Sequence, residues 1–145
     1  MDGVGRGFFS DDNGNEITDC FPRDVGEPLM GSFGLGEVTV INVIAETDVK
    51  VIGIPMQVLM TLLKKHIQLL IVYNQILSKA LYRHVGIKVA IYKHDAMGRY
   101  IWFLKTYPDV IDCVRHKHVA SFLNMTPESL SRVRKKLEQE KSNSL

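Results

Sequence analysis

The chain has 145 residues, of which 46% are hydrophobic and 23% are charged, which is enough for one ordinary domain or two small ones. Its formal net charge of +2 does not by itself indicate a nucleic-acid partner. No signal peptide and no charge-free apolar run near the ~20 residues of a membrane span is visible, so the sequence predicts a cytoplasmic protein with no membrane partner.

The first part of the chain is rich in Gly and β-branched residues and predicts a small sheet. The segments Gly-Phe-Phe at 7–9 and Glu-Ile-Thr-Asp-Cys-Phe at 16–21 flank the turn signal at 11–15, which is typical of a β-hairpin. Two further strands are expected at 38–44 and 50–54, around a turn at 46–48.

Two helices are predicted next, a short one over 55–63 and a longer one over 66–92. Residues at alternating three- and four-residue steps along the longer helix form a heptad seam, and a second apolar stripe on it suits packing against the sheet. A helix that is apolar on two faces must be buried on two sides, so we expect a homodimer; the alternative is a helix buried within its own domain. The expected dimer interface consists of Ile67, Leu70, Asn74, Leu77, Leu81, His84, Lys88 and Ile91.

A third helix is expected over 96–107. Asp95 suits its N-cap, and the helix must end before Pro108 because the residue that precedes a proline disfavours the helical conformation. We expect this helix to bury Ile101 and Leu104, together with an aromatic residue at 102 or 103.

The segment 115–136 predicts two short helices joined by a sharp turn. Val119, Ala120 and Leu123 form the apolar stripe of the first helix, and Ala120 is small enough for a second helix to cross close above it. Asn124 follows at the turn, where the left-handed conformation is needed and Asn tolerates it well.

The second of these helices should begin around Thr126, a good N-cap, followed by Pro127 at the first helical position. Leu130, Val133 and Leu137 form its buried stripe, which leaves a polar and basic face exposed. From 115 to 141, seven Lys and Arg residues outnumber three Glu residues, so positive charge is concentrated here. This pattern predicts a helix-turn-helix that binds double-stranded DNA; the alternative is an ordinary helical hairpin with a solvated basic face.

The expected roles divide the exposed face in two. Arg132 could donate hydrogen bonds to a guanine, and Glu128 could accept one from a cytosine amino group. Together with Ser129 they are the expected base-reading residues. The expected phosphate-binding residues are Lys117, His118, Thr126, Ser131, Arg134, Lys135 and Lys136.

These motifs resemble the Crp/Fnr family of bacterial transcription regulators, and the match is strongest at 98–109, 117–123 and 126–132. The recognition helix of that family carries a Glu and an Arg four residues apart that contact bases, and Glu128 and Arg132 stand at the matching positions. Where several relatives have an Arg before the Glu, this chain has Pro127, so the resemblance implies a different DNA half-site.

The resemblance implies an α+β fold in three parts. These are a partial β jelly-roll (cupin-like) sensor domain at 1–64, a dimerisation helix at 65–93 and a C-terminal winged helix-turn-helix domain at 94–145. The first strands of such a sensor domain have no counterpart here, so we expect an N-terminally shortened chain. RNA polymerase is a further candidate partner.

Within the family's sensor domain, a Gly-Glu pair binds the ribose of a cyclic nucleotide, and a later Arg binds its phosphate. Gly26 and Glu27 fit the first part, but no Arg lies between Arg23 and Arg83. Without a guanidinium the cyclic phosphate loses its bidentate partner, so we expect no response to cyclic AMP, and the sensor ligand is unknown.

No other function class is favoured as strongly. An interaction-only protein that heterodimerises with a related regulator through the long helix is the alternative, and no residue pattern indicates an enzyme. Cys20 and Cys113 lie far apart, without nearby ligands at metal spacing, so we expect reduced thiols, no metal and no cofactor.

Overall fold

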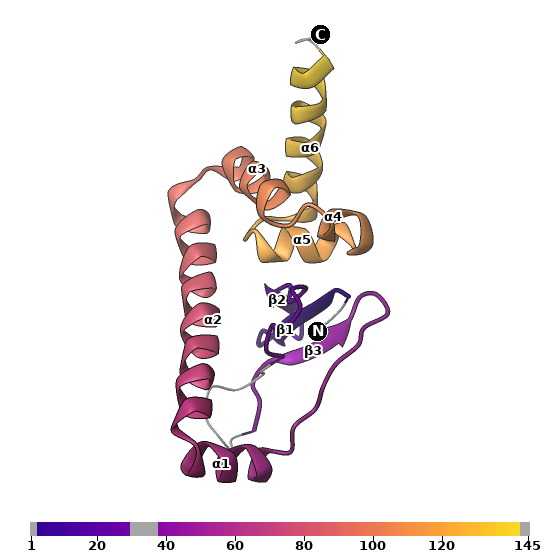
Figure 1. Ribbon diagram of the computed structural model, residues 1–145. Helices are drawn as coiled ribbons and strands as arrows, with labels where there is room; N and C mark the ends of the chain where they lie inside the picture. Colours follow the sequence, from indigo (N-terminus) through magenta and orange to yellow (C-terminus); the bar gives the residue numbers. More distant parts are fainter. Residues whose placement is uncertain (1–2, 30–37, 143–145) are drawn as a thin grey trace. The chain divides into compact units, whose positions relative to one another are not determined.

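The computed structural model describes residues 3–29 and 38–142, and in these ranges it has three strands and six helices (Figure 1). The described residues form two compact units, one within Met1–Gly7 and Phe21–Gly86 and the other within Phe8–Cys20 and Ile87–Leu145. The predicted boundaries after residues 64 and 93 do not coincide with this division, which falls inside the long helix. The predicted α+β class is confirmed. The elements in order are β1 (Gly5–Ser10), β2 (Glu16–Cys20), β3 (Asn42–Ala45), α1 (Met56–Lys65), α2 (Ile67–Lys93), α3 (Ala96–Thr106), α4 (Val110–Cys113), α5 (His116–Phe122) and α6 (Pro127–Ser142).

The predicted hairpin is confirmed as β1 and β2. At its turn, the Asp11 carboxylate accepts hydrogen bonds from the backbone N–H groups of Asn13 and Asn15 at 2.9 and 2.8 Å. Gly14 has φ +80°, a conformation that glycine adopts without strain. A hydrogen bond from the Asn15 side chain, the largest influence, lowers the pKa of Asp11.

The third strand of the sheet is shorter than expected, and the sheet order is β2-β1-β3. Only Asn42–Ala45 pairs as a strand, and Glu46 continues the contact by donating its N–H to the Val4 carbonyl. The strand predicted at 50–54 is wrong, since Ile52 is 94% exposed and no strand is formed there. An alternating apolar pattern becomes a strand only where a neighbouring strand can take its hydrogen bonds.

Both predicted helices that follow the sheet are confirmed. Helix α1 begins directly after Pro55, and α2 runs without interruption over 27 residues. The buried side chains of the pair are few: Leu63 in α1, with Ile87 and Ala90 in α2.

Helix α3 starts as predicted, since the Asp95 side chain accepts a hydrogen bond from the N–H of Gly98 at 2.8 Å. Its buried face differs from the prediction. Tyr100 and Phe103 are buried, whereas Ile101, Trp102 and Leu104 are half-buried. The contiguous apolar run over 100–104 fits either face of a helix, and the contacts of Phe103 with Tyr107 and Phe122 decide which face is buried.

An aromatic cluster forms the core of the C-terminal part. Phe122 of α5 lies between three rings contributed by α3 and the residue after it, with ring centroids 5.5 Å from Tyr107, 5.8 Å from Phe103 and 6.3 Å from Trp102. Such ring pairs contribute ~0.5–1.5 kcal/mol each beyond their buried area. The cluster therefore fixes α5 firmly against α3.

Candidate nucleic-acid interface

The turn between α5 and α6 has the conformation that the sequence predicts. Asn124 adopts φ +52°, the one positive φ of a non-glycine residue in the described part of the chain. The N–H of Met125 then bonds back to the carbonyl of Ala120 at 3.0 Å. Val119, Ala120 and Leu123 are fully buried, as predicted.

Arg99 on α3 holds this turn in place, a role that the sequence did not indicate. One of its guanidinium nitrogens donates to the carbonyl of Leu123 at 2.8 Å and to that of Asn124 at 3.1 Å. Hydrogen bonds from a charged donor are stronger than neutral ones, so a single side chain ties the turn to the aromatic core.

The start of α6 is capped as predicted. The Thr126 hydroxyl accepts a hydrogen bond from the N–H of Ser129 at 3.2 Å, and the two hydroxyl oxygens of these residues lie 3.1 Å apart. Leu130 is buried, while Val133 and Leu137 are half-buried, and α6 packs on both α3 and α5. The position of the helix axis is thus set by contacts on one face only.

The two principal base-reading candidates lie together on the other face. Glu128 and Arg132 are both exposed, and Nε of Arg132 lies 3.4 Å from the backbone carbonyl of Glu128. Hydrogen bonds from the Glu128 backbone N–H and from the Thr126 side chain lower the pKa of Glu128, and the Arg132 charge adds to the effect. This face therefore presents an ionised acceptor beside a guanidinium donor, with the half-buried Ser129 next to them.

Most residues expected at phosphates are accessible. Lys117, Ser131, Lys135 and Lys136 are exposed, and Thr126 is exposed although its hydroxyl caps the helix. Lys136 lies 4.0 Å from Glu140 in a solvent-exposed ion pair, which adds little to stability.

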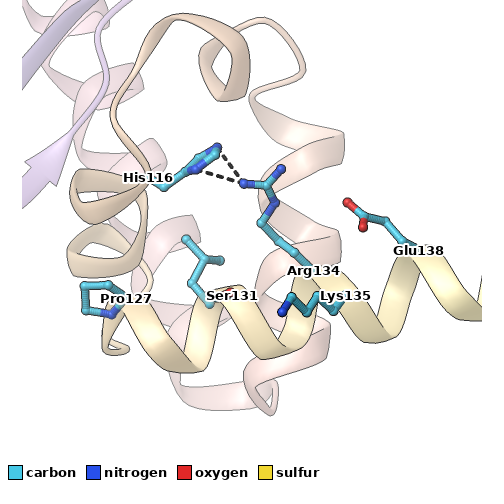
Figure 2. A pocket seen from close by; sticks show the side chains of 7 residues that line it. His116, Pro127, Ser131, Arg134, Lys135 and Glu138 are labelled. Atoms are coloured by element: carbon cyan, nitrogen blue, oxygen red, sulfur yellow. Dashed lines mark hydrogen bonds between the residues drawn. The ribbon is translucent and has the colours of Figure 1, made fainter.

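Two expected phosphate ligands are placed differently. His118 is only 7% exposed, and its Nδ1 lies 3.8 Å from a carboxylate oxygen of Glu16. A buried imidazole is not available to a phosphate, so we correct the expectation for His118. Arg134 is half-buried and is directed at the ring of His116 (Figure 2).

The β-hairpin contacts α5 within the C-terminal unit, and the sequence did not predict this contact either. Ser121 accepts a hydrogen bond from the N–H of Thr18 at 3.0 Å and donates one to the carbonyl of Glu16 at 3.3 Å. One hydroxyl thus satisfies two backbone groups of β2, which packs along α5. No sequence signal relates residues about a hundred positions apart.

The heptad seam of α2 is largely uncovered in the single chain. Ile67 and Leu81 are 60% and 62% exposed. Leu70, Asn74 and Lys88 are exposed as well, whereas Leu77, His84 and Ile91 are half-buried. Exposed apolar side chains that recur along one helix favour association with another helix.

The Gly-Glu pair of the first unit closes a turn. Gly26 has φ +80°, and Glu27 accepts hydrogen bonds from the N–H groups of Arg23 and Asp24 at 2.9 and 3.1 Å. Arg83 of α2 forms ion pairs with Glu27 and Asp24. The Glu27 carboxylate, which the resemblance assigns to a ribose, is therefore engaged by groups of the chain itself.

Within residues 3–29 and 38–142, no three His, Cys, Asp or Glu side chains gather as metal ligands would. No helix in the described ranges combines the length and the apolar character needed to cross a bilayer.

Comparison with known proteins adds no relative. No family model matches the chain, and no curated protein matches its sequence. The likeness to the Crp/Fnr family therefore depends on the sequence motifs alone.

Proposed function

We propose that the chain is a sequence-specific DNA-binding transcription regulator of the Crp/Fnr type, with α5 and α6 as its helix-turn-helix. The observation that carries this proposal is the exposed pair Glu128 and Arg132 on a helix whose opposite face is buried. The capped start of α6 and the fixed turn before it hold the pair in a defined position. Such a helix suits the major groove, where Arg reads guanine and a carboxylate reads cytosine.

Phosphate contacts would come from the accessible basic side chains of Lys117, Lys135 and Lys136, together with Ser131. Lys and Arg at phosphates supply affinity that is independent of sequence and falls with salt. The base-reading pair would supply discrimination.

The test compares one residue of each kind on a DNA site enriched from a random pool. Arg132→Ala should reduce discrimination between the site and its single-base variants by ~1–3 kcal/mol. Lys135→Ala should weaken binding to all DNA sequences alike, and it should lower the slope of log affinity against log salt by about one. Equal effects of the two substitutions on discrimination would contradict these roles.

The proposed regulator acts as a dimer through the seam of α2. Leu81 is on the seam, whereas its neighbour Tyr82 is off it, and both are exposed in the single chain at 62% and 81%. Leu81→Glu should therefore halve the mass in solution and abolish binding to a palindromic site, while Tyr82→Glu should change neither. A monomeric wild-type protein would contradict the dimer.

The three-stranded sheet would belong to a jelly-roll-like sensor that does not respond to cyclic AMP. Its Glu27 is already paired with Arg83, and no Arg between positions 23 and 83 is present to hold a cyclic phosphate. A regulator of this kind would act in the cytoplasm.

A second candidate is an interaction-only protein that pairs with a related regulator through α2. The exposed apolar positions of that helix favour it, since they require a partner helix but not DNA. A dimer that enriches no DNA sequence would support this function over the first.

A further inference from the structure

Arg134 links α6 to two other helices of the C-terminal unit, α5 and α3. Its Nη1 lies 2.8 Å from Nδ1 and 2.7 Å from Nε2 of His116, the first residue of α5 (Figure 2). A neutral imidazole accepts through the one nitrogen that carries no proton, so the guanidinium has an acceptor in either tautomer.

Tyr100 of α3 is a second residue that interacts with Arg134. It is 5% exposed. Burial raises the pKa of its phenol, and the charge of Arg134 and a hydrogen bond from that residue oppose the rise. One guanidinium on α6 therefore interacts with a residue of α5 and with a residue of α3.

The surroundings of Arg134 differ from those of the exposed basic residues on the same helix. A pocket of about 270 Å³ lies beside it, lined by His116, Ser131, Lys135 and Glu138 among others (Figure 2). Lys135 is exposed, whereas Arg134 is half-buried with its guanidinium at the ring of His116. A guanidinium that is engaged by neighbouring side chains must give up those contacts before it can bind a phosphate.

We propose that Arg134 is a positioning residue, which with His116 and Tyr100 sets the angle of α6 against α5 and α3 and so directs Glu128 and Arg132 at the bases. The inference rests on the proposed DNA-binding function and differs from the expectation that Arg134 binds a phosphate. Misplacing α6 would loosen both base contacts, because these require a close geometric match. The exposed Lys135 and Lys136 on the same helix carry their charges on long flexible side chains, so they could still reach phosphates.

The experiment measures two quantities for each variant on the DNA site that the wild type enriches. One is the ratio of affinities for that site and a single-base variant; the other is the slope of log affinity against log salt. Arg134→Met, which keeps the apolar stem, should lower the ratio by about tenfold, the worth of one good base contact, and leave the slope unchanged. His116→Ala should act in the same way, and His116→Gln, which retains an acceptor, should restore the ratio.

The opposite pattern overturns the inference. If Arg134→Met lowers the slope by about 0.9, the contribution of one phosphate contact, and leaves the ratio unchanged, Arg134 is a phosphate ligand. If His116→Ala leaves the ratio unchanged, His116 does not help to position α6. Because His116 is exposed, this variant still tests the inference should Arg134→Met not fold. A wild-type protein that enriches no site would instead refute the proposed function, and the positioning role would fall with it.

Discussion

Replacing Arg99 by Met tests whether one side chain holds the turn between α5 and α6. The substitution keeps an apolar stem and removes two hydrogen bonds, to the carbonyls of Leu123 at 2.8 Å and Asn124 at 3.1 Å. The first is partly buried and comes from a charged donor, a class of bond that contributes ~1.5–3 kcal/mol. The second is exposed and competes with water, so we expect the free energy of unfolding to fall by about 2 kcal/mol in total.

Urea unfolding followed by the fluorescence of Trp102 measures this loss. Trp102 is the only tryptophan of the chain and stacks on Phe122, so its signal reports on the aromatic core beneath the turn. The midpoint should fall by about 1 M, with the slope unchanged. Lys105→Met, an exposed position on the same helix, is the control. A midpoint for Arg99→Met equal to that of the control would refute the argument.

Three further effects follow from single contacts. Thr126→Ala removes the cap of α6 and should cost ~1 kcal/mol of stability in the same urea assay. Ser121→Ala removes two bonds to β2 and should cost about 1–2 kcal/mol, while exposed Ser131→Ala should stay within about 0.5 kcal/mol of wild type. The Glu128 carboxyl should titrate below its usual 4.5 when followed by NMR. Its contribution to stability is therefore complete above that pH and is lost as the pH falls through the lowered folded-state value. Titration of Glu128 above 4.5 would contradict the hydrogen bonds assigned to it.

Local signals in the sequence predicted the structure correctly where contacts between neighbouring residues determine it. Asn124 at a left-handed turn, Thr126 and Asp95 as caps, and the hairpin turn at Asp11 all depend on contacts within four residues. The candidate base-reading face is of the same kind, since the spacing of Leu130 and its stripe fixes which side of α6 is exposed.

Long-range contacts account for what the sequence did not reveal. In the sequence, His118 and Arg134 look like accessible basic side chains, but their placement depends on Glu16 and His116 in other elements. The buried face of α3 is likewise decided by Phe122, and nothing in a run of consecutive apolar residues indicates that choice. Tertiary partners therefore decide which basic side chains of this region are buried and which are exposed.

Enrichment of DNA from a fully randomised pool by the wild-type protein tests the central claim most directly. The account predicts a two-fold symmetric sequence, with half-site centres about one helical turn apart, whose affinity falls steeply as salt rises. A pool that remains random after repeated selection would contradict it.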